Sequence, residues 1–393
     1  MRRQLVKANL RGVRVVDFSW VMAGPMATKM LGAMGAEIIK IESSTRPEFS
    51  QRDGMFSVIN SNKRSCTVNL RHPDGQELLR RIISTSDVVV ENFSSGVLQK
   101  YGLTYQDLRP LKPDLIFVSA SGLGRSGPQR DLLAYGSLLQ GYSGRVGMIG
   151  ELNPFLEAMG ILPAWTDPIT ALWETLAVLA ALHHRDRSGQ GCYVDLSMLE
   201  STVALLPEAL IRAALGQPDG ERASTTEPDA APSGCFRCAG ADEWLAVSVR
   251  SDDEWRGLCR CLGWQDLVEA PACADGSSRL EAKNELNERL ADALRVQPAR
   301  ELERALWQEG VPAARSRHMG ELIADDHLKE RNVFENLQSV PHLGTLPWMD
   351  EEGWRGEYAP APDLGADNDY VFGDLLGLPH SVRDELTKTG AIR

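Results

Sequence analysis

Apolar and polar positions along residues 10–125 follow an alternating order of short strands and helices. Runs such as 13–18 and 37–41 are typical of strands buried on both faces of a sheet. The amphipathic stretches 24–34 and 73–85 predict helices. Further strands are expected at 67–70, 87–91 and 115–120, with a short helix at 96–101. This alternation predicts an α/β fold with a parallel sheet covered by helices.

The middle of the chain changes character. Residues 216–232 are polar and rich in Pro and Gly, which indicates a linker or a surface loop. A second region begins at 233, with a hairpin at 235–249. Helices are then expected near 252–261, 279–294 and 298–309. Residues 331–376 are irregular and rich in Pro, Gly and Trp.

A longer helix is expected from Asp167 to about Arg185. Asp167 is a favourable N-cap residue, and Pro168 suits the first helical position. Unpaired N–H groups and the helix dipole favour an anion there by ~0.3–1 kcal/mol, which would keep Asp167 ionised. On the residue pattern alone, a simple helix cap is the commoner role of such an aspartate. Apolar residues at helical spacing predict a buried stripe of Ile169, Leu172, Trp173, Leu176, Leu179, Ala180 and Leu182.

Charge and hydropathy exclude some classes of function. The 393 residues carry a formal net charge of −12, which argues against general nucleic-acid binding, although a local basic patch can still bind phosphate. The N-terminal residues lack the apolar run of a signal peptide, and no stretch is long and apolar enough to span a bilayer. We therefore expect a soluble, cytoplasmic protein without a membrane partner.

The seven cysteines are dispersed along the chain, which indicates reduced thiols. Cys235 and Cys238 have the spacing of half a zinc site. Cys259 and Cys261 follow with the wrong spacing for the second half. The cysteines are more simply explained as small buried residues, so no metal is expected.

Several short segments of the chain follow one another in a specific order and spacing. They are 10–18, 23–25, 31–42, 62–65, 91–93 and 121–128, followed by the Asp167 helix and the turn 187–191. From Leu10 to Leu378 the chain resembles the class III CoA-transferases of the CaiB/BaiF type. That family includes formyl-CoA transferase, carnitine CoA-transferase and α-methylacyl-CoA racemase. Each segment alone is a weak signal, and their joint order carries the resemblance.

The resemblance implies an α/β fold whose large Rossmann-like domain is built from both chain ends. A smaller α+β domain comes from the middle, and two subunits form an interlocked, ring-like dimer. The implied boundaries are 1–215 for the large domain, 216–232 for the linker, 233–330 for the small domain and 331–393 for the return to the large domain.

The resemblance also implies an activity. The family moves CoA from an acyl-CoA donor, here succinyl-CoA by family habit, to a free carboxylic acid. Asp167 matches the catalytic nucleophile, which forms an aspartyl anhydride and then an aspartyl-CoA thioester. The CoA thioester is a substrate, and no cofactor or metal is implied. Backbone N–H groups at 23–24 or 233–234 are candidate oxyanion donors, because glycine permits close approach.

Positions matching the family's binding residues fall in two groups. The CoA-binding group comprises Val68, Arg71, Asn92, Phe93, Lys100 and Tyr135. The active-site lining comprises Met22, Ala23, Gly24, Gly136 and Gly234. Arg71 stands where many members have Lys, which keeps the charge for a CoA phosphate.

Two departures from the family pattern bear on the substrate. Met22 stands where many members have Gln, and Gly136 follows Tyr135 where many have an acidic residue. The missing carboxylate leaves room for a larger or more acidic acceptor, as in the benzylsuccinate branch.

Two alternatives stay open. Racemase members have His-Asp where this chain has Tyr135 and Gly136, so their proton-transfer pair is incomplete here. Some members are heteromers of two related chains rather than homodimers. The intact Asp167 would make this chain the active partner in such a heteromer.

Overall fold

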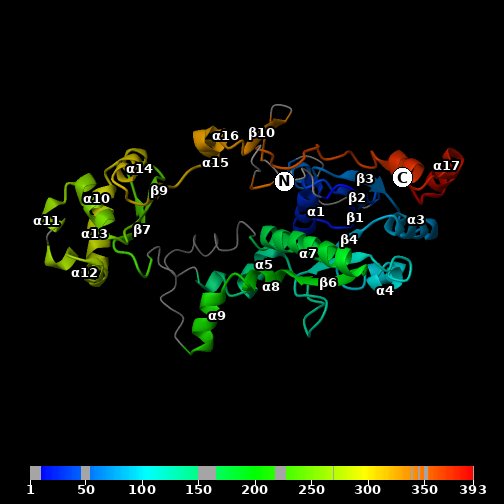
Figure 1. Cartoon of the computed structure of the whole chain (residues 1–393), viewed down its shortest axis with the longest axis horizontal. Coiled ribbons are helices and arrows are strands. Elements are labelled where there is room, and N and C mark those ends of the chain that lie inside the picture. Colours follow the sequence, from blue (N-terminus) through cyan, green and yellow to red (C-terminus); the bar gives the residue numbers. More distant parts are fainter. Residues whose placement is uncertain are drawn as a thin grey trace, which may run out of the picture. The chain divides into compact units, whose positions relative to one another are not determined.

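The described part of the chain falls into two compact units. A computed structural model describes residues 10–45, 54–148, 165–216, 227–268, 270–337, 340–343, 346–348 and 353–392 (Figure 1). Unit 1 takes Met1–Gly147, Glu157–Gly216 and Asn332–Arg393, and unit 2 takes Met148–Leu156 and Gln217–Arg331. Both ends of the chain therefore belong to the same unit.

Unit 1 is built on a six-stranded sheet. Its strands are β1 (Arg14–Asp17), β2 (Glu37–Glu42), β3 (Arg64–Thr67), β4 (Val88–Glu91), β5 (Ile116–Ser121) and β6 (Cys192–Ser197). All neighbours pair in parallel, in the order β3-β2-β1-β4-β5-β6. The expected α/β class with a parallel sheet is confirmed. The strand order reverses between β1 and β4, which is where such sheets bind ligands.

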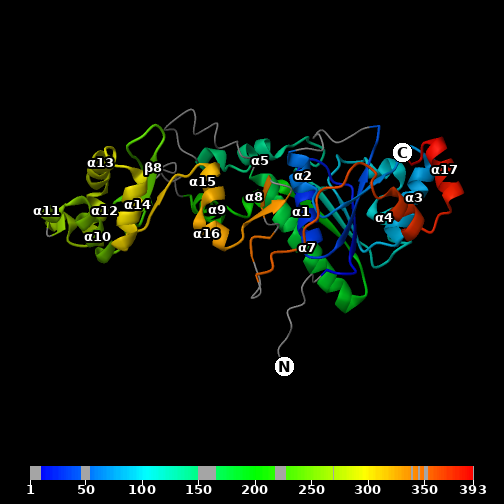
Figure 2. The ribbon, with the colours of Figure 1, turned by 90° about the horizontal axis from the view of Figure 1, so that it is seen from above.

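Both faces of the sheet are buried. Successive residues of a strand point to opposite sides of the sheet, and on β1 each side meets an apolar core. Val15 packs into one apolar core, and its neighbour Val16 packs into the other. The Val15 core includes side chains of α1 (Ala23–Ala33) and α7 (Thr166–Ser188). The Val16 core includes α3 (Pro73–Ser84), α4 (Tyr105–Leu108), the π-helical η4 (Asp369–Leu375) and the edge of α17 (His380–Thr389). Figure 2 shows the two groups of helices on opposite sides of the sheet.

The C-terminal segment is tied to the sheet by polar and apolar contacts. Asp367 accepts hydrogen bonds from the Arg64 guanidinium and the Ser65 amide, both at 2.9 Å. Val371 and Phe372 are fully buried against α3 and the strands. The remaining described elements of unit 1 are α2 (Met55–Ile59), η1 (Leu98–Tyr101), α5 (Gly136–Tyr142), α8 (Met198–Val203), α9 (Pro207–Ala214) and the hairpin β10 (Phe334–Leu337) and β11 (Val340–Leu343). A short turn, η2 (Val146–Met148), follows α5.

Unit 2 has a small antiparallel sheet covered by helices. The sheet contains β7 (Ser233–Arg237), β8 (Trp244–Ser248) and β9 (Ala313–Arg315). The helices are α10 (Asp252–Leu262), α11 (Gln265–Val268), η3 (Pro271–Cys273), α12 (Gly276–Glu281), α13 (Lys283–Leu294), α14 (Ala299–Gln308), α15 (Met319–Ala324) and α16 (Asp326–Glu330). Cys238, Cys259 and Cys273 are buried in its apolar core, and burial raises the pKa of each thiol.

Three details differ from the sequence-based expectations. The strand expected at 67–70 is Arg64–Thr67, because this segment pairs with β2 from Ile39 to Glu42. The hairpin of β10 and β11 lies in a segment expected to be irregular. The long helix begins at Thr166 with Trp165 as its N-cap, so Asp167 lies in the first turn rather than at the cap.

The predicted apolar stripe of α7 is only partly correct: Leu182 is buried and Ile169 and Leu179 are half-buried, but the other four positions are exposed. Leu172, Trp173 and Leu176 are 56%, 40% and 54% exposed, and Ala180 is exposed as well. The side that faces the sheet and α1 carries small and polar residues instead: Thr166, Thr170, Ala171, Glu174, Thr175, Val178, Ala181 and Leu182. Small residues allow α7 to pack along α1, which leaves the large apolar side chains on the outer side.

Candidate functional site

A cavity of about 810 Å³ opens at the carboxyl ends of β1, β4 and β5. Its walls come from the segments that follow these strands, including Trp20 and Met22 after β1 and Asn92 after β4. Ala120 and Ser121 contribute from the end of β5. All its lining residues belong to unit 1. The cavity therefore lies at the edge where the strand order reverses, the usual ligand position of an open parallel sheet.

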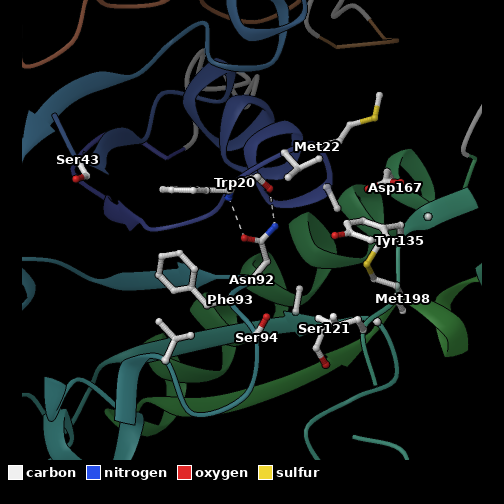
Figure 3. Close-up of a pocket in the computed structure, with 18 of the residues that line it drawn as sticks. Trp20, Met22, Ser43, Asn92, Phe93, Ser94, Ser121, Tyr135, Asp167 and Met198 are labelled. Atoms are coloured by element: carbon white, nitrogen blue, oxygen red, sulfur yellow. Dashed lines mark hydrogen bonds between the residues drawn. The ribbon is translucent and has the colours of Figure 1, made fainter. Parts of the chain in front are cut away.

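Asp167 reaches this cavity from the first turn of α7. In the view of Figure 3 it lies with Met22, Tyr135 and Met198, while Trp20, Phe93 and Ser43 lie toward the opposite end. Among the described residues that line the cavity, Asp167 is the only carboxylate and Arg71 the only cation. One oxygen nucleophile is thus surrounded by apolar and uncharged groups.

The protonation of Asp167 reflects two opposing effects. Burial raises the pKa of Asp167 to about 6, and a hydrogen bond from its own backbone N–H offsets this only in part. The helix N-terminus therefore does not hold the pKa of this carboxyl at its ordinary value. At neutral pH the carboxylate is still mostly ionised, and its raised pKa makes it more basic than an ordinary aspartate.

A buried charge network supports the loop that follows β1. Asp17 is fully buried and accepts hydrogen bonds from Thr28 at 2.7 Å and from Lys63 at 2.9 Å. Lys40 donates to the carbonyl of Ser19 at 2.8 Å. Burial alone would raise the pKa of Asp17, but the charges of Lys63 and Lys40 and hydrogen bonds from Ser19 and Lys63 hold it below its usual value. The network fixes the chain just before it enters the cavity wall.

Glu174 lies seven residues after Asp167 on α7, and sequence reasoning missed it. Its side chain is fully buried, and neither carboxyl oxygen has a hydrogen-bond partner among the described residues. Burial raises the pKa of Glu174 to about 8, and the negative charges of Asp17 and Glu91 add to this, while Lys63 opposes it. Glu174 is therefore a neutral acid at pH 7. The sequence could have indicated such a residue by a Glu seven positions after Asp167, because residues seven apart lie on the same face of a helix.

The structure gathers most of the residues singled out from the sequence. The cavity is lined by Met22, Ala23, Val68, Arg71, Asn92, Phe93, Tyr135, Gly136 and Asp167. Three others lie elsewhere. Lys100 is exposed on η1 and does not line the cavity. Gly24 lies behind the wall, where a Cβ would come within 2.3 Å of the Ser19 side chain. Gly234 belongs to β7 of unit 2, where it pairs with Val247.

The cavity also contains residues that the sequence did not single out. Ser43 and Thr45 follow β2, Ser94 follows β4, and Met198 opens α8 after β6. Each lies beyond the carboxyl end of a strand. These residues come together because their strands end at the same edge of the sheet. The sequence pattern does not reveal the order of the strands in the sheet.

Within 10–45, 54–148 and the other described ranges, no group of three or more His, Cys, Asp or Glu side chains could hold a metal ion. In the same part of the chain, no helix is long and apolar enough to cross a membrane.

Comparison with known proteins identifies the family. A model of "CoA-transferase family III" matches residues 10–368. The Succinyl-CoA--D-citramalate CoA-transferase of Chloroflexus aurantiacus is 31% identical over 398 residues, covering 96% of both chains. The Succinate--glutarate CoA-transferase of Agrobacterium fabrum is also 31% identical, covering 94% of this chain and 96% of the relative. Among solved structures, a CAIB/BAIF family protein from Brucella suis superposes with a TM-score of 0.84 at 27% identity, over 94% of this chain and 100% of that one.

Proposed function

Because the chain belongs to CoA-transferase family III and is an enzyme of that class, we propose that its cavity transfers CoA through a covalent intermediate on Asp167. The observation that carries this proposal is the single carboxylate among the described lining residues. It lies in the first turn of a long helix and is mostly ionised at neutral pH.

The first half of the reaction loads the enzyme with CoA. The Asp167 carboxylate attacks the thioester carbonyl of the donor, a C–O bond forms, and the C–S bond breaks to release CoA as a thiolate. The resulting mixed anhydride joins the donor acyl group to Asp167. The thiolate then attacks the Asp167 carbonyl, forms an aspartyl-CoA thioester and releases the donor as a free carboxylate.

The second half repeats these steps in reverse order with the acceptor acid. The acceptor carboxylate attacks the aspartyl-CoA carbonyl and releases the CoA thiolate, giving a new mixed anhydride. The thiolate then attacks the acceptor carbonyl, which yields the new acyl-CoA and restores the Asp167 carboxylate. Every step passes through a tetrahedral oxyanion, which backbone N–H groups can stabilise. Ala23, at the start of α1, lines the cavity and is the candidate donor in unit 1.

The lining of the cavity supports binding of a CoA thioester. Arg71 supplies the positive charge for a phosphate group, and Val68 and Phe93 provide apolar contacts for the adenine or the pantetheine arm. Met22, Tyr135 and Met198 surround the reacting carboxylate. Gly136 carries no side chain at the position where many family members have an acidic residue.

The names of two relatives support a proposal for the substrate class. Both relatives carry succinate or succinyl-CoA in their names, and their partner acids, citramalate and glutarate, are dicarboxylic. We therefore propose succinyl-CoA as the donor and a dicarboxylic acid as the acceptor. The space at Gly136 is consistent with an acceptor larger or more acidic than a simple fatty acid.

The assembly proposed is an interlocked, ring-like homodimer. In the single chain, Leu172, Trp173 and Leu176 of α7 form an exposed apolar row, and α5 adds Leu138 and Tyr142. Side chains of this size are rarely left exposed together without a partner. Light scattering should give twice 43.2 kDa. A stable monomer that gains activity only with a related second chain would favour the heteromer instead.

A substrate screen tests the proposed function. Purified protein is mixed with succinyl-CoA and single carboxylic acids, and new acyl-CoA species are identified by liquid chromatography and mass spectrometry. We expect a new acyl-CoA with a dicarboxylic acid and an equal amount of released succinate. Hydrolysis of succinyl-CoA alone, across a broad acid panel, would contradict transfer.

A further inference from the structure

The carboxamide of Asn92 bridges the gap where β1 and β4 separate. The Phe18 amide donates to the carbonyl of Val90 at 2.9 Å, which continues the parallel ladder of these two strands. Farther along, the Asn92 side chain takes the place of the β4 backbone as the hydrogen-bond partner of the segment that follows β1. The Trp20 amide donates to Oδ1 of Asn92 at 2.8 Å, and Nδ2 of Asn92 donates to the Trp20 carbonyl at 2.7 Å (Figure 3).

The two hydrogen bonds between Asn92 and the Trp20 backbone, here called the clamp, hold a turn with an unusual backbone. Val21, directly after Trp20, has a φ of 70°, a left-handed conformation that a β-branched residue rarely adopts. Met22 then serves as the N-cap of α1 without a side-chain hydrogen bond of its own. Such a turn persists only where its surroundings determine its shape. The two hydrogen bonds between Trp20 and Asn92, one in each direction, tie both backbone groups of its first residue to the end of β4.

The clamped turn is part of the cavity wall. Trp20, Val21, Met22 and Ala23 all line the cavity that holds Asp167. The Trp20 ring also packs against Phe93 in an edge-on contact, with ring centroids 6.2 Å apart. Release of the Trp20 backbone would therefore move the wall that faces the nucleophile.

We propose that Asn92 is a positioning residue for CoA transfer: its carboxamide holds both backbone groups of Trp20 and so fixes the turn of Trp20, Val21 and Met22 beside Asp167. It acts through this turn, which is a different role from the CoA contact that the family resemblance implies for this position. The inference rests on the proposed function, since it concerns the same reaction at the same site.

The chemistry of the side chain makes the proposal specific. The amide accepts from the Trp20 N–H through its oxygen and donates to the Trp20 carbonyl through its nitrogen, so each hydrogen bond uses a separate atom. Asp at position 92 would keep the acceptor but would present an oxygen, instead of a donor, to that carbonyl. Ala would remove both hydrogen bonds that Asn92 makes with the Trp20 backbone.

The chain supplies a matched control in Asn62. Its Oδ1 accepts from the Ala359 amide at 2.6 Å, and its Nδ2 donates to the Glu357 carbonyl at 3.0 Å. Asn62 thus makes the same double hydrogen bond to backbone, but it does not line the cavity. Asn62→Ala removes an equal number of hydrogen bonds at a position outside the cavity wall.

The test compares Asn92→Ala, Asn92→Asp and Asn62→Ala in the full-length protein. Hydrogen exchange by mass spectrometry follows the peptide that contains residues 18–24, titration with free CoA gives a Kd, and succinyl-CoA turnover gives kcat. For Asn92→Ala we expect about tenfold faster exchange in 18–24 and a kcat lowered about tenfold or more, with the Kd for CoA changed less than about twofold. Asn92→Asp should fall between Asn92→Ala and wild type, and Asn62→Ala should leave kcat unchanged.

A rescue variant separates positioning from simple loss of stability. Val21→Gly removes the conformational penalty of the left-handed residue. Combined with Asn92→Ala, it should restore part of the lost kcat, and thermal unfolding of the single and double variants shows whether this recovery exceeds the gain in stability.

Several results would overturn the proposal. A Kd for CoA weakened more than about tenfold, with unchanged exchange in 18–24, would show that Asn92 contacts the ligand directly. Unchanged exchange together with unchanged kcat would show that the clamp does not hold the turn. If the wild type fails to transfer CoA, the proposed function fails, and the exchange of 18–24 still decides whether Asn92 holds the turn.

Discussion

Asp167 and Glu174 lie two turns apart on the same side of α7, and burial raises the pKa of both carboxyl groups. Asp167 opens into the cavity, so its pKa of about 6 leaves it ionised at neutral pH. Glu174 is fully enclosed, and its pKa of about 8 keeps it protonated. One helix face thus carries a reactive anion at its exposed end and a neutral acid beneath it.

Asp167→Asn should abolish CoA transfer while leaving the fold and CoA binding intact. The amide has nearly the same shape but cannot attack a thioester, so kcat should fall by roughly three to five orders of magnitude. Stability at pH 7.5 should rise, because the variant buries no charge. Turnover assays, CoA titration and thermal unfolding check the three parts. Residual transfer within tenfold of wild type would remove Asp167 from the nucleophile role.

The rate of enzyme acylation should depend on one ionisation near pH 6. The carboxylate form of Asp167 attacks, so protonation as the pH falls through about 6 removes activity. The single-turnover rate with succinyl-CoA should be flat above about pH 7 and fall tenfold per pH unit well below 6. Rapid-quench kinetics from pH 4.5 to 8 check this. A midpoint near 4, the ordinary range of aspartate, would contradict the raised pKa.

Glu174→Gln should change how stability depends on pH. The unfolded carboxyl loses its proton near its ordinary pKa of 4.5, whereas the folded one keeps it up to about 8. The folded state therefore binds the extra proton in this window, and wild-type stability falls as the pH rises from about 4.5 to about 8. Above pH 8 this cost reaches roughly 3–5 kcal/mol, and glutamine does not incur it.

Urea unfolding of both proteins at pH 5 and pH 9 measures the effect. The stability of Glu174→Gln relative to wild type should improve between the two values. Glu77→Gln, at an exposed position of α3, serves as the control and should show no such change. A constant difference between Glu174→Gln and wild type at both pH values would show that Glu174 titrates normally.

Arg71→Ala should raise the KM for acyl-CoA about tenfold with kcat changed much less. Arg71 is the only cation among the described lining residues, and loss of a phosphate contact weakens binding of the ground state and transition state equally. Arg71→Lys should recover most of the affinity. Arg109→Ala removes an exposed arginine outside the cavity and is the matched control. An unchanged KM in Arg71→Ala would remove Arg71 from the CoA site.

The parallel sheet could be predicted from the sequence because its strands carry a direct signal. Val88, Val89 and Val90 form a continuous apolar run, and such runs occur where both faces of a strand are buried. The family motifs, in turn, pointed to most of the residues that the structure gathers around one cavity. The roles assigned to those residues, the domain boundaries and the cytoplasmic location stay predictions.

The orientation of α7 could not be predicted from the pattern of apolar residues. A period of 3.6 identifies a helix, but it does not reveal which side contacts the sheet. Here Thr170 and Ala171 face inward because α7 runs along α1, and Leu172 and Trp173 face outward. Glu174 was not predicted as a site residue, because a charged residue is normally expected at the surface.

Trapping of the intermediate on Asp167 tests most directly whether CoA transfer proceeds through a covalent bond to this residue. The protein is incubated with succinyl-CoA without an acceptor, quenched with hydroxylamine or borohydride, digested, and analysed by mass spectrometry. We expect the peptide containing Asp167 to carry the hydroxamate or the reduced alcohol, and the same peptide of Asp167→Asn to stay unmodified. An unmodified Asp167 peptide in folded, CoA-binding protein that transfers CoA would contradict the covalent route.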